Sequence, residues 1–332
     1  MTLALGVDGG GRRTHAIVSD ASGSILGMGE AGPSNWEIVG LEAAVASITE
    51  ATDAAIDEAG IDRALLEASV FGLAGIDWSD DVDRLEAVIA PLGLGERRRL
   101  VNDAFVALRA GCPQPWGVVV IAGTGTVAAG RDPAGNEFRT IGQGRVFGDF
   151  GSEFDVSELA VRAVANAYTG RGPSTMLTEL LCARTEVASV EELIERIARA
   201  DSRLRSPEVA NMAPLVLEAT EAGDLVARNI LEEIGQALGE TAGLVATRLS
   251  MVDLDFPVVL AGGLFRTPNR YLLDQLELGV RRIAPTAYTL LLETPPVVGA
   301  TLMALELASP AIVAGIGNVL SAAATRRFRA GT

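Results

Sequence analysis

Lysine is absent from this chain of 332 residues, and all 27 of its basic side chains are arginine. That absence excludes lysine Schiff bases, a pyridoxal anchor and a lysine-dependent phosphate loop. The single histidine, His15, and the two cysteines, Cys112 and Cys182, are too few to build a zinc cluster or a multi-cysteine iron–sulfur site from one chain. We expect both cysteines to be small buried or half-buried hydrophobes, with no disulfide framework.

Aromatic residues are scarce, at 5%, and basic residues are outnumbered by 43 acidic ones, which gives a net charge of −16. Such a surface repels phosphate backbones and anionic lipids, so nucleic-acid and membrane-surface binding are disfavoured. Residues 307–325 carry no charge, but Pro310 and Gly315 interrupt them, and we predict a buried terminal helix rather than a membrane span. No basic segment followed by an apolar one opens the chain, so we expect no signal peptide and a cytoplasmic location.

Hydrophobic residues, at 48%, and 37 glycines are abundant, as in α/β proteins packed with Ala, Val and Leu. Residues 3–30 predict three strands joined by a glycine turn and a second tight turn. The same pattern returns at 118–137, and in each copy an Asp, Asp20 or Asp132, lies three residues before the glycine that closes the second turn. This repetition indicates an internal duplication, with chance recurrence of a common turn as the alternative.

Helical patterns lie between and after the two copies, and a buried strand precedes the last of them. The helices are expected at 41–61, 81–92, 153–169, 190–200, 208–222, 224–249 and 269–283, and the strand at 256–263. Strands interleaved with helices predict an α/β fold of mixed sheets flanked by helices, one sheet for each duplicated unit. Since no Gly/Ser-rich linker separates the halves, we expect them to close around a central cleft.

Three glycine loops follow predicted strands, with the sequences GGGRRT at 9–14, GTGT at 123–126 and LAGG at 260–263. Loops without bulky side chains let backbone N–H groups approach an anion, and Thr hydroxyls add donors, so such loops suit a polyphosphate. Asp8, at the end of the first strand, places a carboxylate where it suits a hydrated Mg²⁺ beside those phosphates. Each loop taken alone is equally compatible with a tight hairpin.

Short motifs occur in a fixed order along the chain. They are DGGGRRT at 8–14, GPSNW at 32–36, GLAG at 72–75, ND at 102–103, AGTGT at 122–126, GD at 148–149, LAGG at 260–263 and PPVVGA at 295–300. Together they resemble the BadF/BadG/BcrA/BcrD ATPase family of the actin and hexokinase superfamily, and most closely its N-acetylglucosamine kinase branch. The resemblance covers nearly the whole chain and implies two ribonuclease H-like, actin-like ATPase domains.

The resemblance also implies ATP and Mg²⁺ as ligands, with the metal at Asp8 and with Asp103 as the general base for the sugar hydroxyl. Nucleotide and phosphate binding is implied for Gly10, Gly11, Arg13, Thr14, Gly123, Thr124, Gly125, Thr126, Gly262 and Gly263. Sugar binding is implied for Asn35, Asn102, Asp103 and Asp149. A carboxylate base agrees with the chemistry of phosphoryl transfer in a chain with one histidine.

Structural alternatives exist for these polar residues. For Asn102 and Asp103 the alternative is the N-cap of a helix that begins at AFVAL, a role that Asp fills well. Asn35 and Asp149 each follow a glycine or a Gly-Pro pair by one or two residues, where turn residues are common.

Two stretches depart from the family pattern. Arg12 and Arg13 stand where the family has Thr and Lys, which keeps positive charge and removes a hydroxyl. In GQGRVFGDFGSE, Gln143 replaces an aromatic residue, Phe150 an acid and Glu153 a glycine. We expect these later changes to alter the acceptor pocket more than ATP binding.

The expected function is ATP-dependent phosphorylation of an amino sugar or related hexose, with N-acetylglucosamine as the first candidate and the 6-hydroxyl as the acceptor. Domains are expected at 1–104 and 105–305, with the helix 306–330 completing the first, and a homodimer is implied by resemblance alone. One alternative is an ATPase activator of a dehydratase or reductase, which needs cysteines for a cluster shared between subunits. The other is a regulator that binds nucleotide or sugar without catalysis.

Overall fold

The computed structural model describes residues 2–199, 212–309 and 315–330. The chain forms two compact units. The first comprises Met1–Val119, Ala129–Asn136 and Leu290–Thr332, and the second Val120–Ala128 and Glu137–Thr289. The domain limits expected from the sequence stay a prediction.

Five strands form the first sheet, in the order β3-β2-β1-β4-β5. They are β1 (Leu3–Gly9), β2 (Thr14–Asp20), β3 (Ile25–Ala31), β4 (Ala68–Leu73) and β5 (Arg97–Asn102). β1 is antiparallel to β2 and parallel to β4, and β4 is parallel to β5. Successive side chains of β1 point to opposite faces, so Leu5 enters one core and Ala4 the other. Leu3–Val7 are apolar because both faces of this part of the strand are buried, and the strand ends in Asp8 and Gly9.

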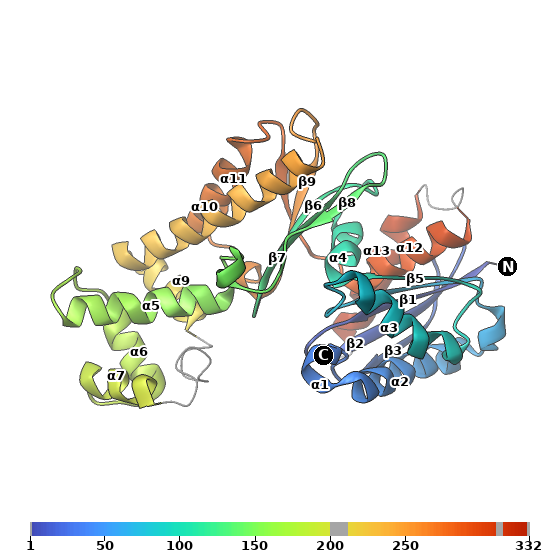
Figure 1. Cartoon of the computed structure of the whole chain (residues 1–332), viewed down its shortest axis with the longest axis horizontal. Coiled ribbons are helices and arrows are strands. Elements are labelled where there is room, and N and C mark those ends of the chain that lie inside the picture. The colour runs from blue at the N-terminus through green and yellow to red at the C-terminus, as the bar shows by residue number, and fades with distance from the viewer. Residues whose placement is uncertain (1, 200–211, 310–314, 331–332) are drawn as a thin grey trace. The chain divides into compact units, whose positions relative to one another are not determined.

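Helices cover both faces of this sheet (Figure 1). They are α1 (Trp36–Val39), α2 (Leu41–Ala59), α3 (Ser79–Ile89), α4 (Asp103–Gly111), α12 (Pro296–Ala308) and α13 (Ile316–Ala330), with 3₁₀ turns at Arg63–Leu65 and Ala90–Leu92. α2 and α3 share a core with Leu5, whereas α4 and α12 share one with Ala4. α12 lies so close to β1 that a side chain at Gly6 would collide with the backbone of Thr301.

The uncharged stretch 307–325 differs from the buried helix predicted for it. It contains the end of α12 and most of α13, and residues 310–314 lie outside the described part of the chain. α13 buries Leu320 and Ala324 but leaves Val319 52% exposed, so the helix is only half-buried. Among the described helices, none combines the length and apolar character that crossing a bilayer requires.

The second sheet repeats the strand order of the first. Its order is β10-β9-β6-β7-β8, so β6, β7 and β8 take the places of β1, β2 and β3, while β9 and β10 take those of β4 and β5. The strands are β6 (Gly117–Ala122), β7 (Thr126–Arg131), β8 (Glu137–Arg139), β9 (Pro257–Ala261) and β10 (Tyr288–Leu291). The second turns also match, because Gly23 and Gly135 each donate an N–H to the Asp three residues earlier, at 3.0 Å, with positive φ. The two predicted mixed sheets are therefore present, and their shared order supports the duplication.

The described part of the second unit contains further helices. They are α5 (Glu153–Tyr168), α6 (Leu177–Thr185), α7 (Val190–Arg199), α9 (Ala213–Glu221), α10 (Leu225–Arg248) and α11 (Arg270–Arg281), with 3₁₀ turns at Arg145–Phe147 and Gly263–Phe265. α6 is missing from the sequence prediction, and residues 200 and 208–211 of two predicted helices lie outside the described part. α10 packs directly on α11, since a Cβ on Gly239 would collide with the backbone of Leu276.

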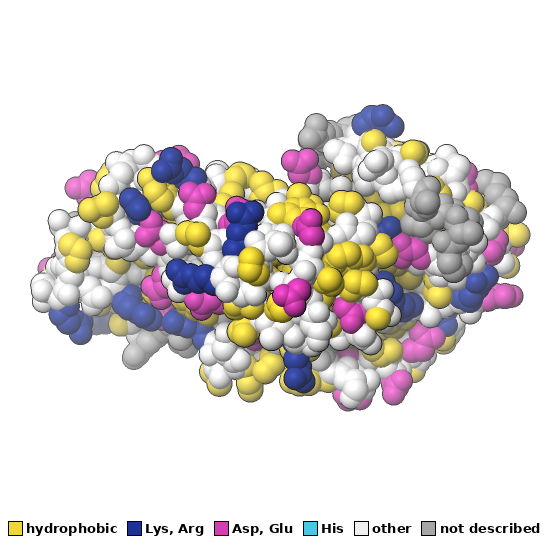
Figure 2. All heavy atoms as spheres, turned by 90° about the horizontal axis from the view of Figure 1, so that it is seen from above, with side chains coloured by type: hydrophobic (Ala, Val, Ile, Leu, Met, Phe, Trp, Pro, Cys, Tyr) yellow, Lys and Arg dark blue, Asp and Glu magenta, His cyan; other side chains and the backbone are white. Residues whose placement is uncertain are grey.

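Charged side chains of both signs are interspersed on the face drawn in Figure 2. On that face, arginines do not gather into a continuous basic surface of the kind that follows a nucleic-acid backbone.

Candidate active site

Asp8 and Asp103 meet at one edge of the first sheet. Strands β1, β4 and β5 are parallel, so their carboxyl ends share this edge, and the register places Asp8 beside Gly72 and Gly72 beside Val101. Burial and then the nearby charge of Asp103 raise the pKa of Asp8 from 3.8 to about 7. Two carboxylates held together where water solvates them poorly favour a bound proton or a cation.

Asn102 provides the helix cap that the sequence left open between it and Asp103. Its Oδ1 accepts the N–H of Ala104 at 3.1 Å, and its Nδ2 donates to the carbonyl of Ile76 at 3.1 Å and to Asp77 at 3.2 Å. Asp103 is the first residue of α4, where the helix dipole stabilises a negative charge. The structure thus gives Asn102 a positioning role and leaves the cap independent of the Asp103 carboxylate.

The first glycine loop is tied to the segment that carries Asn35. The carbonyl of Gly10 accepts hydrogen bonds from the N–H groups of Ser34, at 3.0 Å, and Asn35, at 3.2 Å. Asn35 also caps α1, because its Oδ1 accepts the N–H of Glu37 at 3.1 Å. Asn35 therefore has a local structural role, like the turn residue considered as the alternative for it. It also lies beside Gly10 and near the exposed Gly11.

Arg13 and Thr14, at the end of this loop, differ in whether their polar groups are available to a ligand. Thr14 is fully buried, and its hydroxyl donates to a backbone carbonyl at 2.7 Å and lies 2.8 Å from Ser34 Oγ. Arg13 is exposed and pairs with Glu30, also exposed. Because exposed ion pairs are weak, Arg13 can exchange Glu30 for a phosphate at little cost, whereas the Thr14 hydroxyl is already used.

The second and third glycine loops lie side by side in the second unit. The turn 123–126 joins β6 to β7, and Gly262 and Gly263 follow β9. A Cβ on Gly123 would come within 3.8 Å of the backbone nitrogen of Gly263. Thr126 is 8% exposed, and its Oγ1 has no hydrogen-bond partner within the described residues. An unpaired buried hydroxyl costs stability that a ligand can restore, so this turn fits a phosphate group.

Glu153 lies against these same two loops. It is the first residue of α5, and its N–H donates to the carbonyl of Gly123 at 2.8 Å. Its carboxylate occupies the space that a Cβ on Gly263 would need. The departure from the family pattern at Glu153 therefore lies beside the two loops predicted to bind the nucleotide.

Asp149 holds the loop that precedes α5. It is buried, and its Oδ2 accepts the N–H of Gln143 at 2.9 Å. Three glycines with positive φ shape the loop, namely Gly142, Gly144 and Gly148. Arg145 stacks over the ring of Phe150 at 4.9 Å, so the residue that departs from the family pattern contributes to the loop's packing.

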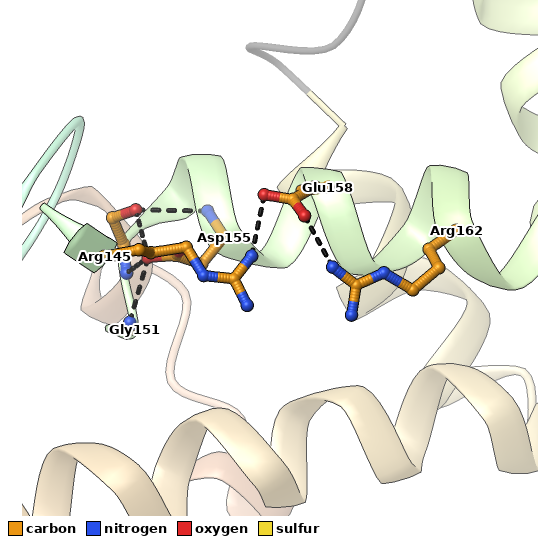
Figure 3. Close-up of polar contacts among 6 residues, drawn as sticks. Arg145, Gly151, Asp155, Glu158 and Arg162 are labelled. Carbon is orange, nitrogen blue, oxygen red and sulfur yellow. Dashed lines mark hydrogen bonds and ion pairs between the residues drawn. The ribbon is translucent and has the colours of Figure 1, made fainter. Parts of the chain in front are cut away.

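An ion-pair network that the sequence did not predict fastens this loop to α5 (Figure 3). Arg145 lies 2.7 Å from Glu158 and 3.5 Å from Asp155, and Glu158 also pairs with Arg162. The other oxygen of Asp155 accepts from the N–H and hydroxyl of Ser152 at the start of the helix. The signal available in the sequence was the Ser-x-x-Asp capping pattern that opens α5.

The two cysteines differ in their surroundings. Burial raises the pKa of Cys112 to about 12, which makes its thiol unreactive. Cys182 lies in the other compact unit and is partly buried. Among the described residues there is no group of three or more His, Cys, Asp and Glu that could hold a metal ion.

Comparisons with known proteins agree with the motifs. A model of the BadF/BadG/BcrA/BcrD ATPase family matches residues 5–304. The N-acetylmuramic acid/N-acetylglucosamine kinase of Clostridium acetobutylicum is 31% identical over 277 residues, covering 83% of this chain and 90% of that protein. The N-acetyl-D-glucosamine kinase of Dictyostelium discoideum is 31% identical over 316 residues, covering 92% and 98%.

Solved structures share the fold. A candidate N-acetylglucosamine kinase from Chromobacterium violaceum superimposes with a TM-score of 0.66 at 24% identity, covering 93% of this chain and 99% of that chain. At this level of identity the likeness concerns the fold alone.

Proposed function

The chain belongs to the BadF/BadG/BcrA/BcrD ATPase family, and from that premise we propose that it is an ATP-dependent kinase of amino sugars, with N-acetylglucosamine as the first acceptor. The observation that carries the proposal is the Asp8–Asp103 pair at the edge of the first sheet. Phosphoryl transfer needs a carboxylate to orient and deprotonate the hydroxyl and a second group to hold the metal. This edge supplies both.

Asp103 takes the proton of the attacking hydroxyl, which we assign to carbon 6 of the sugar. Its position at the first turn of α4 fixes the carboxylate on a rigid element, and the Asn102 cap holds that turn in place. Asn35 and Asp149 bind other hydroxyls of the sugar. Each is held by a hydrogen bond to a backbone N–H, which presets its orientation before substrate arrives.

The donor chemistry at Asp8 fits Mg²⁺. A carboxylate whose pKa is raised to about 7 by burial and by a neighbouring carboxylate gains stability when a cation replaces the proton. Mg²⁺ is commonly held by one or two carboxylates together with phosphates and water, and it supplies charge neutralisation at the transferring phosphoryl group. Asp8 is the residue that would hold it.

The glycine loops and Arg13 would bind ATP. Backbone N–H groups of Gly10, Gly11 and the turn 123–126 suit the phosphates, and Gly262 with Gly263 suits the nucleoside. The buried, unpaired hydroxyl of Thr126 supports this assignment.

Thr126→Val tests the second loop. We expect nucleotide affinity to fall by roughly 5- to 10-fold, while the ligand-free protein keeps its stability or gains up to about 1 kcal/mol, because the lost hydroxyl had no partner. Thr14→Val is the matched control, since it removes a hydroxyl with two partners and should cost about 1–2 kcal/mol. Nucleotide titration and urea unfolding measure both effects. An equal loss of stability in the two variants would refute the assignment of Thr126.

The activity itself is tested by ADP release with Mg·ATP across a panel of sugars. The panel contains N-acetylglucosamine, glucosamine, N-acetylmannosamine, N-acetylmuramic acid and glucose, with a blank that lacks sugar. We expect sugar-dependent ADP release, highest for N-acetylglucosamine, and none for its 6-deoxy analogue. A flat panel from protein that still binds ATP would contradict the amino-sugar assignment, and turnover of the 6-deoxy analogue would contradict the 6-hydroxyl.

A further inference from the structure

Glu153 brings a negative charge onto two loops that otherwise carry none. The turn 123–126 and residues 260–263 contain only Gly, Thr, Leu and Ala. The Glu153 carboxylate lies over Gly263, and its backbone N–H is bound to the carbonyl of Gly123. A carboxylate thus lies beside the backbone N–H groups that are expected to bind the polyphosphate.

Two features of the surroundings bear on the negative charge of Glu153. The N-terminus of α5 stabilises a negative charge at its first residue. Arg145, the cation nearest along the chain, is engaged by Asp155 and Glu158 instead. Within the described residues no side-chain ion pair involves Glu153. A ligand at these loops therefore meets a fixed negative charge.

We propose that Glu153 makes the nucleotide site select the cation-bound form of ATP over the free nucleotide. The inference rests on the proposed function, because it takes the two loops as the ATP site. Coulomb repulsion scales with the product of the charges, and a bound divalent cation cancels two of the charges of ATP. Free ATP is therefore repelled more strongly than its Mg²⁺ complex. A glycine at position 153 would lack this discrimination.

The test is an equilibrium titration of wild type and Glu153→Gln with ATP, once with Mg²⁺ and once with EDTA, in the absence of sugar. We expect wild type to prefer Mg·ATP, and Glu153→Gln to reduce that preference by ~10-fold or more, chiefly because free ATP binds more tightly. Glutamine has nearly the same size as glutamate, so any steric effect of the side chain on ATP binding is the same in the variant as in wild type. Glu232→Gln is the matched control: it removes the same charge from the same unit, but at a carboxylate held by Arg228 at 2.7 Å, and should leave the preference unchanged.

Several results would overturn the proposal. One is an unaltered preference in Glu153→Gln, and another is an equal change in Glu232→Gln, which would trace the effect to net charge. A third is an equal gain in the affinity of Glu153→Gln for both forms of ATP, which would show that Glu153 weakens nucleotide binding without discriminating between the two forms. Wild-type protein that binds neither form would instead refute the nucleotide site, and the proposed function with it. Thermal unfolding of each variant without ligand verifies that the fold is intact.

Discussion

Asp103→Asn is expected to lower kcat for sugar phosphorylation by at least ~100-fold, since the variant cannot accept the proton of the attacking hydroxyl. KM for both substrates should change by less than about 5-fold, because asparagine retains the shape and hydrogen-bonding capacity of the side chain. The helix itself should be unharmed. Asn102, and not Asp103, provides the cap of α4.

Steady-state ADP release in the presence of sugar measures this loss, and calorimetric titration with ATP verifies that binding persists. Asp53→Asn is the matched control, because it makes the same chemical change in the first unit at an exposed carboxylate paired with Arg63. It should retain wild-type kinetics. Residual activity above about one tenth of wild type in Asp103→Asn would place the base elsewhere, given the size expected for general-base catalysis.

The sheet and most helices were predictable because their signals are local. Alternation and apolar runs identify β1 and β9, and the period of apolar residues identifies α2 and α10. The duplicated turns were also visible, since a turn with an Asp and a glycine of positive φ is encoded within four residues. The residue types at the edge of the first sheet could be named from the order of the motifs.

The state of each site residue was not predictable, because it depends on partners far away in the sequence. Thr14 and Thr126 occupy equivalent ends of two glycine turns, yet Ser34 satisfies the first and nothing described satisfies the second. Glu153 meets Gly263 only because α5 begins against the loop that follows β9. Such contacts depend on tertiary packing, which a local sequence pattern cannot predict.

Asp8→Asn is expected to abolish phosphorylation and, at the same time, to stabilise the metal-free protein at neutral pH. The pKa of Asp8 is raised from 3.8 to about 7 in the folded state, first by burial and then by Asp103. The folded state therefore binds the proton more tightly than the unfolded chain. The resulting destabilisation is absent below pH 4, grows between pH 4 and 7, and is complete above pH 7. This rise in the pKa of Asp8 lowers the free energy of unfolding by as much as about 4 kcal/mol.

Urea unfolding in EDTA at pH 4.5 and pH 8 separates the two effects. At pH 8 the variant should be more stable than wild type by up to about 4 kcal/mol, and near pH 4.5 the two should differ by less than about 1 kcal/mol, because the wild-type carboxyl is then protonated in the folded state. The kinase assay at pH 8 with Mg²⁺ should show a loss of at least ~100-fold, as expected when the carboxylate that holds the metal is removed.

Mg²⁺ supplies the decisive control. If Asp8 holds the cation, Mg·ATP should raise the unfolding midpoint of wild type by more than that of Asp8→Asn, since only binding to the folded state adds stability. A variant that is less stable than wild type at pH 8 would show that the Asp8 carboxylate is compensated within the protein. A variant that keeps its activity would show that the metal lies elsewhere. A variant that is more stable than wild type at pH 8 but inactive would support the proposed role of Asp8. It would show that the ionised carboxylate destabilises the metal-free protein and that the bound cation offsets this loss of stability.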